Sequence, residues 1–313
     1  MQPEIEKILG TLELLTQPSL CFDLPGHEDG GNFVPFAWDV SEWGKFNIRN
    51  LCLSNGWLKI TDVDATFKEW QYLEYIKHFP DFHLSLEQQN FRENSIKKLF
   101  QFLENNLEYL ESFILDYHSD RTYTKFPGFI IGRTKSGDWI GIAQTVYKET
   151  KIPENMISRS PQISINSENL EENTLNLIVK IQEIISELGT IHLSGDLGGG
   201  YLYTYEHKFV FTTAKTKELV FEKIIQASEI LEVNQFYNFY PNANYLQDWY
   251  RDNNYQELSQ RYDTINRFFR HTFEETFMYR FSFWTQEYIY VLGKTPGKNL
   301  VGLYLDSEFI YNP

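Results

Sequence analysis

Two stretches far apart in the chain share one pattern: FIIGRTKSGDWIGIAQTVYKET at Phe129–Thr150 and IYVLGKTPGKNLVGLYLDS at Ile289–Ser307. In each, an apolar run ends at a glycine, a basic residue and a threonine follow, and a second glycine comes nine positions later. The glycines are Gly132 and Gly141 in the first stretch, and Gly293 and Gly302 in the second. Both glycines recur at one offset along the chain, since 293 − 132 equals 302 − 141. Such self-similarity is typical of a repeated structural unit.

The sequence around the two stretches repeats one order of elements. Apolar residues at helical spacing predict a long helix over 96–110, followed by strands in SFILDYHS, PGFIIG and WIGIAQTV. A late helix through Phe269 precedes strands in FMYRFSFW, EYIYVLG and LVGLYLDS. Residues 151–168 contain two prolines and no sustained period, which is typical of a linker. We predict an α+β fold with mostly antiparallel sheets and two domains, 1–150 and 169–313, the second a diverged copy of the first.

The repeated glycines have a structural interpretation. Gly132 and Gly293 open the last hairpin connection of each half, where we predict a positive φ. Gly141 and Gly302 fall inside the last strand, where a missing side chain lets a helix or a neighbouring strand approach closely.

The charge of the protein is strongly acidic and evenly spread. The 313 residues include 43 Asp and Glu against 28 Lys and Arg, for a net charge of −15. The first 150 residues carry −8 and the remainder −7, so the acidity belongs to both halves. Acidic surfaces repel phosphate backbones, which argues against nucleic acid as a partner and favours a basic protein. The alternative is that the charge only keeps the protein soluble.

Neither the N-terminus nor the distribution of apolar residues points to export or to a membrane. The N-terminus, MQPEIEKILG, carries acids where a signal peptide needs a basic start and an apolar run. No stretch approaches the roughly 20 apolar residues that span a bilayer. We expect a cytoplasmic protein whose two cysteines, Cys21 and Cys52, are reduced and packed.

The motifs of common enzymes fail in this sequence. Gly293-Lys294-Thr295 lacks the earlier glycine of a phosphate-binding loop, because Tyr288 stands at that position. The glycine-rich run at 195–200 precedes a strand and not the helix that a phosphate site needs. Asp62 or Asp64 is interpreted as the cap of the following helix, since no third metal ligand lies at a fixed offset. We predict a protein without catalytic activity, metal or cofactor.

Several short patterns in residues 1–150 together resemble the nuclease A inhibitor-like family. They are Phe33-x-x-Phe36-x-Trp38, Lys59-x-x-Asp62-x-Asp64-x-x-Phe67, Gly132-x-Thr134, Gly141-Ile142 and Glu149-Thr150. The second half shares clearly only the ending of strand, Gly-x-Thr and strand. The resemblance implies an α/β/α sandwich for each domain, with no catalytic activity, and a role in binding and blocking a sugar-nonspecific, magnesium-dependent nuclease.

The resemblance also implies which residues contact the partner. The family directs an acidic side chain from the loop after its first strand toward the metal of the nuclease, and Glu28 and Asp29 lie in the corresponding loop here. The family uses the end of its chain as a second contact, which corresponds to Glu149 and Thr150, although this chain continues beyond them. The alternative interpretation is a duplicated acidic interaction module that has lost nuclease binding.

Overall fold

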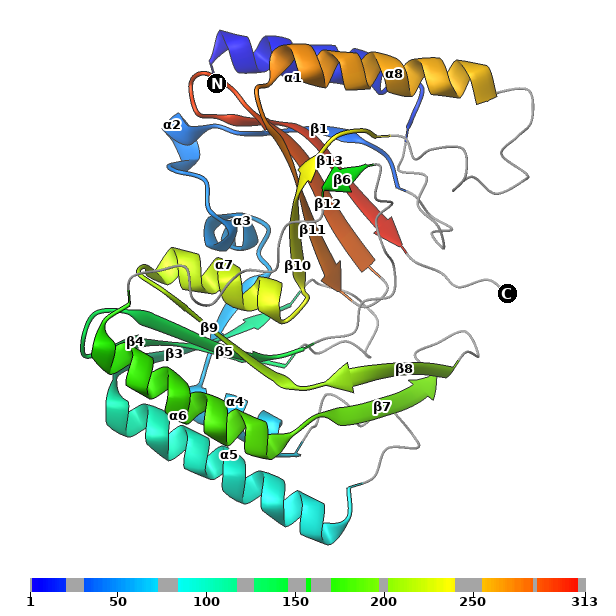
Figure 1. Cartoon of the computed structure of the whole chain (residues 1–313). Helices are drawn as coiled ribbons and strands as arrows, with labels where there is room; N and C mark the ends of the chain where they lie inside the picture. Colours follow the sequence, from blue (N-terminus) through cyan, green and yellow to red (C-terminus); the bar gives the residue numbers. More distant parts are fainter. Residues whose placement is uncertain are drawn as a thin grey trace. The chain divides into compact units, whose positions relative to one another are not determined.

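The computed structural model describes residues 2–20, 31–72, 84–116, 127–145, 156–158, 170–196, 202–239, 255–283 and 286–308 (Figure 1). The chain divides into two compact units, each built from separate segments. Unit 1 comprises 1–46, 148–162 and 231–313, and unit 2 comprises 47–147 and 163–230.

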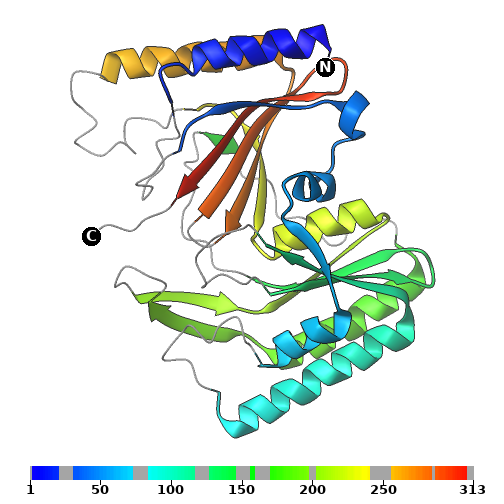
Figure 2. The same ribbon diagram turned by 180° about the vertical axis from the view of Figure 1, so that it is seen from behind.

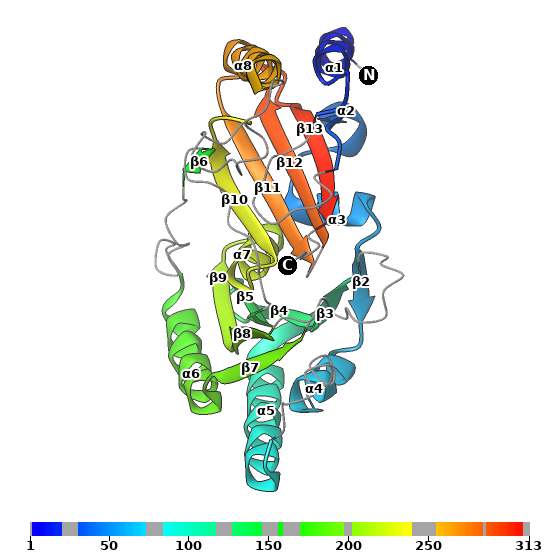
Figure 3. The ribbon, with the colours of Figure 1, turned by 90° about the vertical axis from the view of Figure 1, so that its right-hand side faces the viewer.

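Unit 1 contains a six-stranded antiparallel sheet in the order β1-β13-β12-β11-β10-β6, whose long strands lie side by side in Figure 3. The strands are β1 (Val34–Trp38), β6 (Ile157–Ser158), β10 (Leu231–Phe236), β11 (Thr276–Phe283), β12 (Gln286–Lys294) and β13 (Leu300–Glu308). The helices of this unit are α1 (Pro3–Leu15), the short α2 (Val40–Trp43) and α8 (Tyr255–Thr272).

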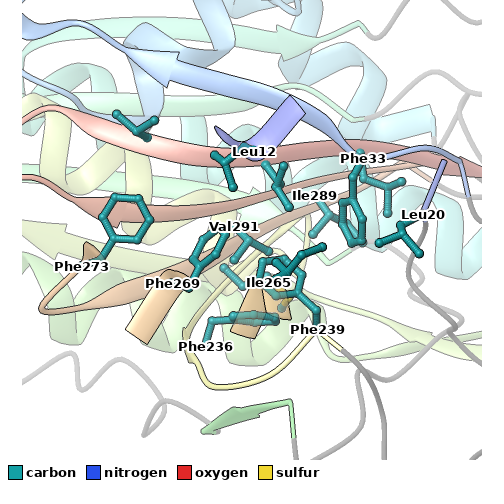
Figure 4. Close-up of a cluster of buried hydrophobic side chains, with 14 of the residues drawn as sticks. Leu12, Leu20, Phe33, Phe236, Phe239, Ile265, Phe269, Phe273, Ile289 and Val291 are labelled. Carbon is teal, nitrogen blue, oxygen red and sulfur yellow. The ribbon is translucent and has the colours of Figure 1, made fainter. Parts of the chain in front are cut away.

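The core of unit 1 lies between its sheet and the helices α1 and α8. Pro3 opens α1, where its missing N–H costs nothing, and Ile5, Ile8 and Leu12 form the buried stripe of that helix. Ile265 and Phe269 of α8 join the same cluster. Figure 4 shows Leu12, Phe269 and the strand residues Ile289 and Val291 directed into this cluster. Burial of this apolar face, at roughly 25 cal/mol per Å², holds the two helices on the sheet.

Unit 2 contains a five-stranded antiparallel sheet in the order β2-β3-β4-β5-β9, and a separate hairpin of β7 and β8. The strands are β2 (Leu58–Thr61), β3 (Leu107–Leu115), β4 (Phe129–Thr134), β5 (Trp139–Gln144), β7 (Ile191–Asp196), β8 (Leu202–His207) and β9 (Phe209–Ala214). The helices are α3 (Ile48–Ser54), α4 (Val63–Tyr72), α5 (Leu86–Asn106), α6 (Glu172–Leu188) and α7 (Lys217–Ala227).

Helices cover both faces of the five-stranded sheet. Residues of α5 and α6 such as Leu99 and Ile184 pack with Ile130 and Ile142 on one face. Phe221 of α7 packs against strand aromatics on the other face. Figure 2 shows the yellow-green ribbon of α7 on the side of the sheet opposite α5 and α6. Unit 2 thus has helices on both faces of its sheet. The mostly antiparallel α+β class is confirmed for the chain.

The units differ from the contiguous domains expected at 1–150 and 169–313. Residues 1–46 group with 231–313 because β1 pairs with β13, and residues 163–230 group with 47–147 because β9 pairs with β5. Strand pairing between distant segments therefore decides the grouping. The grouping changes between 162 and 163, inside the expected linker, and also at 46–47, 147–148 and 230–231.

The predicted long helix ends earlier than the apolar pattern suggests. Helix α5 stops at Asn106, and Leu107 and Leu110 belong to β3. Both leucines continue the helical spacing, but they contribute to the sheet side of the core, next to an irregularity between Leu107 and Tyr109. Sequence periodicity alone does not distinguish these two uses of a leucine.

The predicted positive φ at Gly132 and Gly293 is wrong, because both lie inside strands, in β4 and β12. Each glycine instead makes room for packing. A Cβ at Gly132 would lie 2.5 Å from Leu107, and one at Gly293 would lie 2.0 Å from the ring of Phe273.

The prediction of close approach at Gly141 and Gly302 is confirmed. A Cβ at Gly141 would lie 2.9 Å from Ile224 of the helix α7. A Cβ at Gly302 would lie 1.9 Å from the carbonyl oxygen of Val291 in the neighbouring strand. The positive φ of the two hairpins occurs at Gly137 (92°) and at Lys298 (65°).

Lys298 offers a test of the hairpin geometry. Its side chain is exposed, and its left-handed backbone costs about 1–2 kcal/mol that glycine does not incur. We expect Lys298→Gly to raise the free energy of unfolding by roughly 0.5–1 kcal/mol, after the greater freedom of glycine in the unfolded chain is counted. The midpoint of urea denaturation measures it.

Gly137→Ala is the matched control, because Gly137 holds the corresponding turn position with a positive φ. A methyl group there would meet its nearest neighbour, Nη2 of Arg133, at an ordinary contact distance of 3.8 Å, so only backbone strain is added. We expect that substitution to lower the midpoint. A lower midpoint for Lys298→Gly would contradict the assigned turn.

Candidate partner-binding site

The four residues that the resemblance assigns to partner contact are Glu28, Asp29, Glu149 and Thr150. All four lie outside the described residues. The structure does describe the residues from which both segments depart, and for the first segment also the residues to which it returns. These anchor points determine where the two segments leave the folded units.

The segment that carries Glu28 and Asp29 has a fixed base in unit 1. The backbone N–H of Phe33 donates a hydrogen bond of 2.8 Å to the carbonyl oxygen of Leu20, so the chain returns to where it left. Both side chains are buried, and the ring of Phe33 meets Phe239 edge-on at 5.4 Å between centroids. The acidic loop is therefore closed at its base by a backbone hydrogen bond and a core aromatic pair.

Gly31 places this base against the end of β13. Its φ is 63°, and a Cβ there would lie 1.8 Å from the carbonyl oxygen of Asp306. Any other residue would both strain the backbone and collide with β13. The double glycine in LPGHEDGGN is the sequence signal for this contact, but on its own it indicates only a loop.

Aromatic and acidic side chains gather near that contact. Asp306 is exposed and pairs in register with Tyr288 of β12. The rings of Tyr288 and Tyr304 stack at 6.4 Å, and Tyr304 is only partly buried. Burial, and then the charge of Asp306, raise the pKa of the Tyr304 phenol, which stays neutral and able to donate a hydrogen bond. Sequence analysis did not select these three residues.

The segment that carries Glu149 and Thr150 departs from a buried anchor in unit 2. The N–H of Thr145 donates to the carbonyl oxygen of Lys208 at 2.9 Å, and the Thr145 hydroxyl donates to that of Glu206 at 3.1 Å. The carbonyl oxygen of Thr145 lies 3.1 Å from Nδ1 of His207. Because a carbonyl oxygen only accepts hydrogen bonds, the ring proton of His207 is on Nδ1. Thr145 is thus held on three sides before the segment leaves.

His207 is a neutral histidine in the core of unit 2. Burial, and then the positive charge of Arg92, lower its pKa to about 3. Arg92 is also buried, with its Nε donating to the carbonyl oxygen of Trp70 at 2.9 Å. The histidine acts as a structural donor in this site and is not a catalytic base.

His207 makes the stability of the protein depend on pH. The unfolded chain binds a proton at this histidine near pH 6.5, whereas the folded chain does so only near pH 3. Its contribution is therefore fully present above pH 6.5 and is lost as the pH falls toward 3. We expect His207→Gln to lose less stability than the parent protein between pH 7 and pH 4.5, measured by urea denaturation at both values.

The exposed His192→Gln serves as the control for removing a histidine. An equal loss of stability in the parent and in His207→Gln over this pH range would contradict the assignment.

The remaining candidate motifs have structural roles. Asp62 precedes α4, and its Oδ1 accepts a hydrogen bond of 3.1 Å from the N–H of Asp64, so the capping interpretation is confirmed. Cys52 is a buried free thiol, whose pKa burial raises. Asp196 ends β7 and Leu202 begins β8, so the glycine-rich run joins two strands of a hairpin.

Metal and membrane sites find no support in the described ranges. Among those residues, no three His, Cys, Asp or Glu side chains are grouped so that they could hold a metal ion. None of the helices described here combines the length and the apolar character needed to cross a bilayer. The described geometry presents the base of the acidic loop, held by Leu20, Gly31 and Phe33, on the strand that also carries Tyr304 and Asp306.

Comparison with known proteins supports one family. Residues 203–306 match the family model described as nuclease A inhibitor-like protein. Searches of curated proteins and of solved structures gave no significant match. The match covers most of β8, the strands β9 to β12 and most of β13, and it falls on the half that the sequence patterns indicated as the diverged one. Residues 203–306 of this chain are thus similar to the nuclease A inhibitor-like family.

Proposed function

We propose that the protein is a non-catalytic inhibitor that binds a sugar-nonspecific, magnesium-dependent nuclease in the cytoplasm. It needs no cofactor, and its partner is a basic protein and not nucleic acid or a membrane. The observation that carries the proposal is the match of residues 203–306 to the nuclease A inhibitor-like family.

The charge of the chain supports the same proposal. A nuclease cleft that attracts DNA is basic, and a protein with a net charge of −15 is steered toward such a cleft. Electrostatic steering raises the rate of association, and salt screens it over a Debye length of about 8 Å at physiological ionic strength. Inhibition by this protein is therefore expected to set in more slowly at high salt.

We propose Glu28 and Asp29 as the residues that approach the nuclease metal, with Glu149 and Thr150 as a second contact. The hydrogen bond between Phe33 and Leu20 supports the first contact, since it fixes the two points at which the segment carrying Glu28 and Asp29 joins unit 1. A carboxylate in a desolvated, cationic site forms a strong interaction, and removing one partner of such a pair costs on the order of 2–5 kcal/mol.

The alternative is an acidic interaction module that has the fold but does not bind a nuclease. It is favoured by the continuation of the chain beyond Thr150, since the family uses a chain end as its second contact and here that position is internal. The two functions differ in one measurable property, which is inhibition of nuclease activity.

Replacing both loop acids tests the proposed function. We expect Glu28→Gln with Asp29→Asn to weaken inhibition of a sensitive nuclease at least tenfold, about 1.4 kcal/mol. The assay measures the inhibition constant against a panel of purified sugar-nonspecific, magnesium-dependent nucleases, on DNA and on RNA.

The control is Glu183→Gln with Glu187→Gln, two exposed acids of α6. Both double variants remove two negative charges, so a difference between them reports position and not net charge. If both double variants inhibit the nuclease equally less well, Glu28 and Asp29 contribute only through net charge and not through a specific contact. No inhibition of any nuclease by the parent protein would favour the interaction module.

A further inference from the structure

The sheets of the two units have the same order of strands. In unit 1 the order is β1-β13-β12-β11-β10, with β6 added at the far edge. In unit 2 the order, from the other edge, is β9-β5-β4-β3-β2. Three strands that are consecutive in the chain occupy the middle of each sheet, namely β11 to β13 in unit 1 and β3 to β5 in unit 2.

The register of the strands is equivalent as well. Ile131 pairs with Gly141 in unit 2, and Leu292 pairs with Gly302 in unit 1. Matching residues of the two pairs differ in number by the same amount, since 292 − 131 equals 302 − 141. This difference is also the one that separates the repeated glycines in the sequence. A shift of one residue would reverse the faces of the strands, so this agreement is a strict test of equivalence.

The hairpin turns repeat at the same offset. The N–H of Thr134 donates to the carbonyl oxygen of Asp138 at 2.8 Å, and that of Thr295 donates to Asn299 at 2.9 Å. The two positive-φ positions, Gly137 and Lys298, are also separated by the repeat offset. Chain direction, register and turn geometry therefore agree over the last two strands of each unit.

The edge strands that complete the two sheets are crossed. Ala37 of β1 pairs with Val301 of β13, and Thr213 of β9 pairs with Ile140 of β5. Val301 and Ile140 are equivalent positions of the repeat, so β1 and β9 hold equivalent places. In the sequence, β1 comes before the three central strands of unit 2, β3 to β5, yet it pairs with β13 of unit 1. In the same way, β9 comes before the three central strands of unit 1, β11 to β13, yet it pairs with β5 of unit 2.

The helices before these strands are crossed in the same way. Helix α1 precedes β1 and packs in the core of unit 1, where Ile8 and Ile265 of α8 share one cluster. Helix α6 precedes β9 and packs in the core of unit 2, where Ile184 and Leu99 of α5 share one cluster. Each helix-strand pair contributes to a core built mainly from the other half of the sequence.

We propose that the chain is a pair of tandem repeats, residues 3–144 and 172–308, that have exchanged their N-terminal helix and one edge strand, α1 with β1 and α6 with β9. Segment α1-β1 completes the sheet of the second repeat, and segment α6-β9 completes the sheet of the first. The arrangement corresponds to a strand-exchanged dimer joined into one chain. The proposal does not depend on nuclease inhibition.

The exchange has a direct consequence for the acidic loop. Gly31, which follows that loop, packs against Asp306 in the second repeat. The loop of the first repeat is therefore anchored by the second repeat. Residues 1–150 in isolation would lack β9, leave β5 as an open edge, and leave β1 without its partner. The two repeats depend on each other for folding, although they are consecutive in the sequence.

Paired cysteines in the full-length chain distinguish exchanged from unexchanged strands. Directly opposed residues of antiparallel strands lie within disulfide range. The exchanged arrangement predicts a cross-link in Ala37→Cys with Val301→Cys. An unexchanged arrangement predicts it in Ala37→Cys with Ile140→Cys, because Ile140 is the equivalent position in the other repeat. Mass spectrometry of digested, oxidised monomer identifies the linked peptides.

We expect most of the oxidised monomer to carry the 37–301 link, and no detectable 37–140 link. A 37–140 link within one chain would overturn the proposal, and so would a 37–301 link found only between chains. Absence of both links from folded, oxidised protein would also count against it, since both pairs have the same register.

The reciprocal strand provides a second set if the first variants do not fold. Thr213→Cys with Ile140→Cys is expected to cross-link within one chain, and Thr213→Cys with Val301→Cys is not. The two sets probe different edges, so the exchange must hold at both.

Discussion

Each sheet of this protein is completed by a strand that is remote in sequence, and the compact units follow from those two pairings. β13 binds β1 over five paired positions, and β5 binds β9 over six. Without these partners both strands would expose a row of backbone N–H and C=O groups, which are costly to leave unpaired once side chains cover them. The base of the acidic loop and the apolar faces of helices α1 and α6 lie in the units that these two pairings define.

The glycines show how closely the last strands are packed. Gly302 brings β13 against the backbone of Val291, and Gly141 brings β5 against Ile224 of α7. A methyl group at either position would have to move a strand or a helix, and cores tolerate such overpacking poorly. The repeated glycine spacing in the sequence therefore marks close contacts of the last strands with a neighbouring strand or helix, and not positive-φ positions of the turns.

The fold class could be predicted from the sequence, and so could the close approach at the last strands, but the pairing of the edges could not. Gly141 and Gly302 carry a local signal, since their spacing repeats and no polar role explains them. The alternation of β1 fits either β5 or β13, because both present equivalent faces and the same register.

The candidate site, too, could be predicted from the sequence only in part. The acidity of the loop is visible in the sequence, but the contact of Gly31 with Asp306 joins opposite ends of the chain, and no local pattern indicates it. Such contacts are decided by topology, which short motifs do not encode.

The two hairpin turns illustrate how equivalent positions diverge under one constraint. Asp138 and Asn299 are both buried, and each accepts a hydrogen bond from a backbone N–H near the start of a helix. Asp138 accepts from Glu171, and its charge is balanced by Lys215 at 2.8 Å. Burial opposes its ionisation, but the hydrogen bonds from Lys215 and Glu171 prevail, and the pKa of Asp138 is lowered. Asn299 accepts from Val40 at 2.9 Å with a neutral amide, which carries no charge to balance. Both hairpin turns thus contain a buried hydrogen-bond acceptor, and the negative charge of the acceptor at Asp138 is balanced by Lys215.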